Sequence, residues 1–247
     1  MSALEVAVSK NHDELSAAIA DRLIVFLVNA QADGGEPHIA LTGGRIGTSC
    51  LASLAASPHA DSIDWDRVHV WWGDERYVAA DSADRNDLGA QEALLSKVPL
   101  NPTKVHHMPS TDDVFTTVED AAAWYGEALQ RSGQPLDLVL LGIGPDGHIA
   151  SLFPELPALT DDRPCVAVHG SPKPPPTRIT LTFPVIQSAR EVWILASGDE
   201  KATALRLALQ EGVGELQIPA AGARGLLRTL VLADEDAASK LEGFGQR

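Results

Sequence analysis

Cysteine is scarce in this chain, which has only Cys50 and Cys165. Two thiols cannot build a disulfide framework, and neither belongs to a C-x-x-C pair. The sequence also lacks H-E-x-x-H, and His106 and His107 are adjacent rather than on one face of a helix, so a metal site has little support. We therefore expect both thiols to be buried structural groups and no metal to be bound.

Positive charge is also in short supply. Lys and Arg total 19 against 34 Asp and Glu, a formal charge of -15, which argues against a broad electrostatic contact with nucleic acid. An anionic substrate would need a local cationic pocket in such a protein.

Long apolar runs are missing too. The longest near the start, Leu23 to Val28, is far shorter than the roughly 20 residues of a membrane span. Residues 1–14 contain no basic stretch followed by an apolar run, so no secretory signal is indicated. We expect a cytoplasmic protein with neither a membrane nor a nucleic-acid partner.

No repeat, low-complexity tract or flexible linker divides the 247 residues. With 45% hydrophobic and 21% charged residues, the chain can bury a substantial core. We expect a single domain over residues 1–247, and a monomer is favoured.

Short β-rich runs alternate with longer segments of helical period, which is typical of an α/β fold. The pattern predicts a mostly parallel, Rossmann-like sheet covered by helices on both faces. The expected strands are residues 5–8, 38–41, 67–72, 136–141, 164–168, 177–182, 191–196 and 228–232. The expected helices are residues 13–32, 46–56, 87–97, 118–131 and 200–211.

Ligands of open α/β sheets bind at the loops that follow the carboxyl ends of the strands. The first such loop contains Thr42, Gly43 and Gly44 and leads into a helix, where backbone amides are suited to phosphate. A Gly-Gly pair would serve a tight turn equally well. The chain has no G-x-x-x-x-G-K-[ST] for a nucleoside triphosphate and no G-x-S-x-G for serine-based acyl transfer.

Two further loops supply cations. Arg76 follows a strand with two tryptophans, and Asp74 or Glu75 is expected to hold its guanidinium in place. Lys173 lies in a proline-rich loop, and Arg178 follows that loop in the next strand. Each could be a surface charge, but together these cations would form the pocket that a phosphorylated substrate needs.

The loop after residues 136–141 carries the strongest chemical signal. Gly142, Gly144 and Gly147 match G-x-G-x-x-G, but Asp146 would place a negative charge where a pyrophosphate sits, so we reject dinucleotide binding. The glycines instead expose His148, which can accept and release a proton near neutral pH. Asp146 is expected to orient the imidazole and to stabilise its charged form.

Four motifs, in this order and over most of the chain, resemble the glucosamine-6-phosphate isomerase/6-phosphogluconolactonase family: residues 42–44 (TGG), 73–76 (GDER), 142–154 (GIGPDGHIASLFP) and 173–180 (KPPPTRIT). Deaminases of this family typically read Asp-Glu-Tyr in the second motif and Ala-Phe-Asn-Glu-Pro at the end of the third. Arg76 and the segment Ser151 to Pro154 favour the lactonase branch. One departure lies after Gly44, where Arg45-Ile46-Gly47 replaces the usual Ser-Thr-Pro.

The resemblance implies hydrolysis of 6-phospho-D-glucono-1,5-lactone to 6-phosphogluconate, a step of the oxidative pentose phosphate pathway, with no metal or organic cofactor. It implies His148 as the general base that activates water. Thr42, Gly43, Gly44, Arg76, Lys173 and Arg178 are then the expected substrate-binding residues, and a sugar-phosphate lactone is the expected partner. An amino-sugar phosphate deaminase and a non-catalytic sugar-phosphate sensor are the two alternatives.

Overall fold

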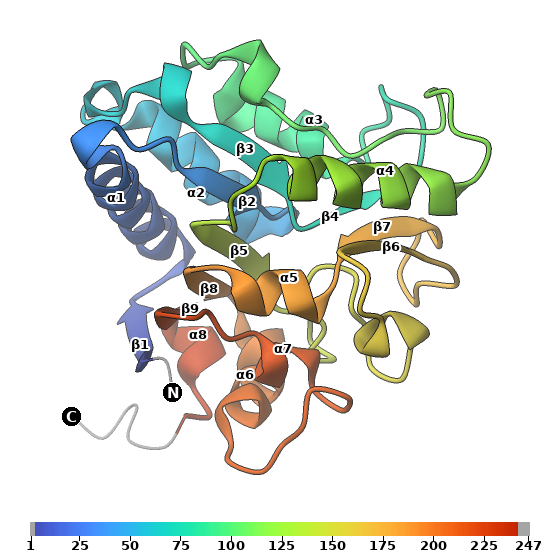
Figure 1. Cartoon of the computed structure of the whole chain (residues 1–247). Coiled ribbons are helices and arrows are strands. Elements are labelled where there is room, and N and C mark those ends of the chain that lie inside the picture. Colours follow the sequence, from blue (N-terminus) through green and yellow to red (C-terminus); the bar gives the residue numbers. More distant parts are fainter. Residues whose placement is uncertain (1–2, 242–247) are drawn as a thin grey trace.

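The computed structural model describes residues 3–241, and its centre is a six-stranded sheet (Figure 1). The strand order is β1-β9-β8-β5-β2-β3, and each neighbouring pair is parallel. The strands are β1 (Ala3–Ser9), β2 (His38–Leu41), β3 (His69–Trp72), β5 (Leu138–Gly142), β8 (Glu191–Ala196) and β9 (Arg228–Asp234). The predicted α/β fold with a mostly parallel sheet is confirmed.

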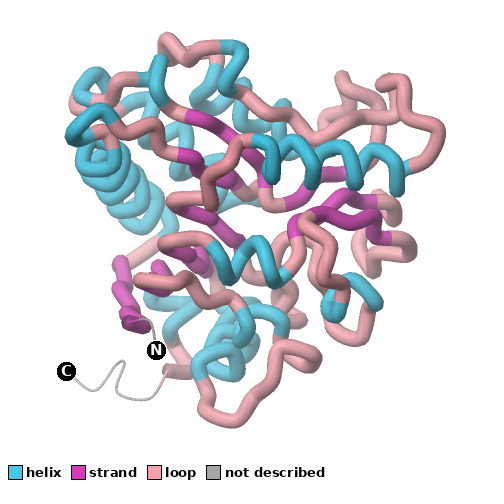
Figure 2. Tube along the Cα trace, viewed as in Figure 1, coloured by secondary structure: helices cyan, strands magenta, loops and turns pink. Residues whose placement is uncertain are grey.

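Helices lie on both faces of this sheet. Figure 2 shows the strands running through the middle of the molecule between helical layers, with α1 and α2 packed together on one side and α4 and α5 on the other. The helices are α1 (His12–Ala30), α2 (Gly44–Ala56), α3 (Asn86–Ala90), α4 (Val118–Arg131), α5 (Phe183–Ser188), α6 (Ala202–Leu209), α7 (Pro219–Gly222) and α8 (Glu235–Ala238).

The local sequence explains where these elements form. The side chain of Asn11 accepts a hydrogen bond from the amide of Glu14 at 2.9 Å and so caps the first turn of α1. Leu15, Ile19 and Leu23 recur every four residues along α1 and are buried against the sheet. Strand β5 is apolar at every position before Gly142 because helices cover both of its faces.

Two predicted strands belong to a different sheet. β6 (Cys165–Val168) and β7 (Arg178–Leu181) pair antiparallel, and β7 also pairs antiparallel with β4 (Asp74–Arg76). β4 lies in a segment that we expected to be a loop. The carbonyl of Gly73 accepts from the amide of Leu181 at 2.9 Å, so this small sheet begins directly where β3 ends.

Two predicted helices are shorter than expected. The segment predicted over residues 87–97 begins as α3 and continues as a π-helical turn over Gln91–Leu95. The one predicted over residues 200–211 is a 3-10 turn at Asp199–Lys201 followed by α6. Both thiols are buried as expected, and burial raises the pKa of Cys50 to about 12. Among the described helices, none is long and apolar enough to span a bilayer.

Candidate active site

A cleft of about 330 Å³ opens at the carboxyl ends of β2, β5 and β8. This is the edge of a parallel sheet where ligands bind. The structure brings seven of the eight predicted site residues into its lining: Thr42, Gly43, Gly44, Arg76, His148, Lys173 and Arg178. The eighth, Asp146, lies behind one of them, in contact with His148.

The glycine pair after β2 forms the start of α2. Gly43 is the N-cap, and Gly44 has a φ of 77°, which few other residues adopt. A Cβ on Gly43 would lie 1.8 Å from Oδ1 of Asn86, so glycine is required for this close approach. The hydroxyl of Thr42 accepts from the amide of Gly142 at 3.2 Å and thereby ties the loops after β2 and β5 together. The residues at the start of α2 line the cleft, and the free amides of a helix start can bind an anion.

The glycine-rich loop after β5 presents His148 to the cleft. Gly144 donates its amide to the carbonyl of His148 at 2.8 Å, and Gly147 donates to the carbonyl of Gly144 at 2.9 Å. A Cβ on Gly144 would lie 1.9 Å from Nδ1 of His148, so this glycine makes room for the imidazole. The next regular element is a 3-10 turn at Pro157–Thr160 rather than a helix. The loop therefore lacks the helix N-terminus that would bind a pyrophosphate.

Asp146 holds the imidazole of His148. Its Oδ1 is hydrogen-bonded to Nδ1 of His148, whose side chain is 14% exposed, and the ring packs on Phe153 at 4.5 Å between centroids. Burial opposes ionisation of Asp146, but the hydrogen bond to His148 and the nearby positive charges, including Lys173, outweigh it and lower the pKa of Asp146 to about 2. The carboxylate is thus charged at neutral pH, and Nε2 is the ring nitrogen left for a ligand.

Hydrogen bonds from Arg178 hold the proline-rich loop in place. Its guanidinium donates to the carbonyls of Pro175 at 2.7 Å, Lys173 at 3.0 Å and Pro174 at 3.2 Å. Nη1 lies 4.0 Å from a carboxylate oxygen of Asp74. Burial lowers the pKa of the Lys173 ammonium, while Asp146 opposes this shift. Arg178 therefore places Lys173 at the cleft in addition to lining it.

The expectation that Asp74 or Glu75 holds the Arg76 guanidinium is wrong. Nη1 of Arg76 donates to the carbonyl of Asp84. The carboxylate of Glu75 accepts the backbone amide of Arg76 at 2.8 Å but no hydrogen bond from its guanidinium. Asp74 instead accepts from the hydroxyl of Ser151 at 2.6 Å. Alternating side chains of a strand point to opposite sides, so Glu75 of β4 is directed away from the cleft that its two neighbours line.

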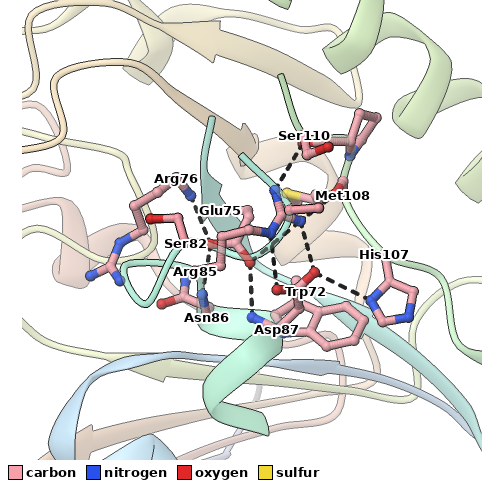
Figure 3. A network of polar contacts seen from close by, with 12 residues as sticks. Trp72, Glu75, Arg76, Ser82, Arg85, Asn86, Asp87, His107, Met108 and Ser110 are labelled. Atoms are coloured by element: carbon pink, nitrogen blue, oxygen red, sulfur yellow. Dashed lines mark hydrogen bonds and ion pairs between the residues drawn. The ribbon is translucent and has the colours of Figure 1, made fainter. Parts of the chain in front are cut away.

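Glu75 belongs to a polar network whose central members are buried (Figure 3). Its carboxylate accepts the amides of Asn86 at 2.7 Å and Asp87 at 2.9 Å, at the start of α3. Arg85 forms a bidentate ion pair with the carboxylate of Asp87 at 3.0 and 2.8 Å and also donates to the carbonyl of Met108. Burial raises the pKa of Glu75 to about 7, against the opposing effect of Arg85. The network fixes the backbone from which Asn86 and Arg76 reach the cleft.

Several residues of the cleft were not predicted from the sequence. Ser197, Glu200 and Lys201 follow the predicted strand 191–196, so the rule that selected the other loops would have found them. Asn86 precedes the predicted helix 87–97, and nothing in the sequence marks its contact with Gly43. Among residues 3–241, five cationic side chains line the cleft against two acidic ones, although the whole chain is acidic: Arg45, Arg76, Lys173, Arg178 and Lys201, against Asp74 and Glu200.

The comparison with protein families decides the family. The family model described as "Glucosamine-6-phosphate isomerases/6-phosphogluconolactonase" matches residues 10–231. The chain belongs to this family. It is 49% identical to a 6-phosphogluconolactonase of Streptomyces coelicolor, over 96% of this chain and 94% of that protein. It is 46% identical to a 6-phosphogluconolactonase of Mycobacterium tuberculosis, over 96% of this chain and 98% of that one.

Solved structures show the same family fold. The 6-phosphogluconolactonase of Trypanosoma brucei superposes with a TM-score of 0.84 at 26% identity, covering 98% of this chain and all of that one. A monomeric glucosamine-6-phosphate deaminase superposes with a TM-score of 0.81 at 19% identity, over 96% and 99% of the two chains. The second likeness is one of fold alone. Membership of the family, expected from the four motifs, is confirmed.

Proposed function

We propose that this family member hydrolyses 6-phospho-D-glucono-1,5-lactone to 6-phosphogluconate. The observation that carries the proposal is one imidazole, held by a charged carboxylate, beside a cleft rich in cations. The relatives that align over nearly their whole length with this chain, at 46–49% identity, are 6-phosphogluconolactonases. A lactone hydrolase needs a group that activates water and a site for the phosphate, and the cleft offers both.

In this proposal His148 acts as the general base. Because Nδ1 of His148 is hydrogen-bonded to Asp146, Nε2 takes a proton from water. The water oxygen then forms a bond to the lactone carbonyl carbon. The tetrahedral intermediate then breaks the bond to the ring oxygen, which receives the same proton from the imidazolium. Asp146 stabilises the imidazolium between these two steps. The product acid finally releases its proton to solvent.

The cations and the amides of α2 have two tasks in this reaction. Arg76, Lys173 and Arg178, with the amides of Gly43 and Gly44, are proposed to bind the phosphate and to stabilise the developing oxyanion. Thr42 is proposed to hold the first loop against the loop of His148.

The direct test is proton release from freshly prepared lactone. We expect the protein to accelerate acid production well above the spontaneous hydrolysis of the same solution. A rate equal to the background would overturn the proposal. Release of ammonia from glucosamine 6-phosphate, measured in parallel, would point to the deaminase branch instead.

Removing the Lys173 ammonium should weaken phosphate binding. A hydrogen bond to a charged group contributes about 1.5–3 kcal/mol, so Lys173→Ala should raise KM for the phosphorylated lactone about 10- to 150-fold. Unphosphorylated gluconolactone should be affected much less. Lys97→Ala, which removes an exposed lysine away from the cleft, is the matched control. Equal losses on both lactones would place Lys173 at the carbonyl or in the fold.

Replacing Asp146 with asparagine tests whether the carboxylate of Asp146 assists His148 as the general base. Because the pKa of Asp146 is about 2, its carboxylate is charged at every pH of a normal assay. Asp146→Asn removes that charge, so turnover should fall and the acid limb of the pH–rate profile should move to lower pH. Unchanged turnover with an unmoved acid limb would assign Asp146 to the loop structure alone.

A further inference from the structure

A chain of four hydrogen-bonding side chains reaches the cleft at the end of β8, the strand next to the one that His148 follows. Nδ1 of His12 lies 2.9 Å from the hydroxyl of Ser197, and Nε2 of His12 lies 3.0 Å from the hydroxyl of Ser49. The Ser197 hydroxyl lies 2.6 Å from Oδ2 of Asp234. The four residues come from α1, α2, the end of β8 and the end of β9. Of the four, only Ser197 lines the cleft.

The direction of these hydrogen bonds follows from Asp234. Its two carboxylate oxygens accept the amide of Gly198 at 3.0 and 3.1 Å and the amide of Ala237 at 2.8 Å. A side chain that accepts several amide protons in a buried position acts as a carboxylate, which has no proton to give. Ser197 must therefore donate its single proton to Asp234. The short 2.6 Å contact fits a hydrogen bond to a charged acceptor.

These donor and acceptor assignments determine how the Ser197 hydroxyl can hydrogen-bond to a ligand. Since Ser197 donates its proton to Asp234, Nδ1 of His12 must be the donor in its contact with Ser197. Nε2 of a neutral His12 accepts from Ser49. A hydroxyl has one proton and two lone pairs. Ser197 has thus used its proton and one lone pair, and one lone pair remains for the cleft.

We propose that Ser197 is a specificity-determining residue that accepts a hydrogen bond from one hydroxyl group of the sugar lactone. His12 and Asp234 are positioning residues that fix this polarity. A fully ionised phosphate has no proton to donate, so Ser197 serves the polyhydroxyl part of the substrate and not its phosphate. The neighbouring charge of Asp234 makes the Ser197 oxygen a stronger acceptor. This inference rests on the proposed lactone substrate. It adds the hydrogen bond by which one of the substrate's hydroxyl groups is recognised.

Substrate analogues test this polarity without any mutation. Each ring hydroxyl of the phosphorylated lactone is replaced in turn by hydrogen and by fluorine, which accepts weakly and cannot donate. At one position we expect both analogues to raise KM by about five- to tenfold, the effect of about 1 kcal/mol for one lost hydrogen bond. Each kcat is divided by the analogue's own spontaneous rate, because fluorine activates the carbonyl. A fluorine analogue that binds as well as the natural substrate at every position would overturn the proposal.

Variants then assign the effect to Ser197. In Ser197→Ala we expect KM for the natural substrate to rise about five- to tenfold and kcat to change little. KM of this variant for the deoxy analogue at the sensitive position should equal its KM for the natural substrate, because the hydrogen bond is already lost. His12→Ala should reduce the same discrimination, and His12→Asn should restore it because the asparagine amide can donate from near the Nδ1 position. If His12 had only a structural role, His12→Ala and His12→Asn would discriminate equally between the natural substrate and the deoxy analogue.

The outcomes separate this inference from the proposed function. If the protein hydrolyses the lactone but Ser197→Ala discriminates against the deoxy analogues as the natural protein does, the inference fails and the function stands. If no lactone is hydrolysed, direct binding of 6-phosphogluconate and its deoxy analogues by calorimetry still measures the hydroxyl preference. Loss of that preference in Ser197→Ala would support the inference there, and its persistence would overturn it.

Discussion

Replacing His148 with alanine is expected to lower kcat for the phosphorylated lactone by about 10²–10⁴-fold, the usual contribution of a general base. The reason is local. The change removes the proton acceptor but leaves the glycine loop at the start of α2, the cations of the cleft and the Arg178 contacts to the proline-rich loop unaltered. KM should therefore change much less than kcat. The measurement is steady-state proton release, corrected for spontaneous hydrolysis.

A change at a second histidine provides the control for His148→Ala. His59 is exposed, lies outside the cleft and donates only its backbone amide to a side chain, so His59→Ala should keep normal activity. Binding of 6-phosphogluconate to His148→Ala, measured by calorimetry, should stay close to that of the natural protein. Turnover of His148→Ala within about threefold of the natural protein would exclude a general base at this position.

The sequence predicted which loops line the cleft where one rule applied. Parallel strands place their carboxyl ends along one edge of a sheet, so the loops beginning at Thr42 and at Gly142 had to meet there. The sequence also predicted that the glycine-rich loop exposes His148, but that Gly144 makes room for the imidazole is seen only in the structure. Family motifs added the substrate class, which periodicity and composition do not contain.

The failures have a common physical cause, which is that sequence adjacency says little about which side chains meet. Asp74 and Arg76 both line the cleft, while Glu75 between them faces α3, because the segment is a short strand with alternating directions. Only the antiparallel partner β7 makes it a strand, and that pairing joins residues about 100 positions apart. The hydroxyl of Ser197 acquires its polarity from His12 and Asp234, which come from distant parts of the chain.

Gly144→Ala is expected to reduce turnover by about 10²-fold, the lower end of the range expected for removal of His148 itself. The backbone of Gly144 does not have a positive φ, so alanine is compatible with the local conformation. Its Cβ, however, would lie 1.9 Å from Nδ1 of His148 and 2.5 Å from Oδ1 of Asp146. Both groups must move to reach ordinary contact distance, the imidazole by roughly 1 Å or more. A displacement of that size at a reacting group can cost about 10²-fold in rate.

The matched control for this substitution is Gly214→Ala, because a methyl group added to Gly214 would have no atom within 4 Å and the residue has no positive φ. It changes the same residue type and should leave kcat and KM unaltered. For Gly144→Ala, kcat should fall while binding of the product through the phosphate remains, since Gly144 lies beside the imidazole and not among the cations. A variant with normal kcat would mean that the loop relaxes without moving His148, and that the geometry of the imidazole and its carboxylate does not limit the reaction.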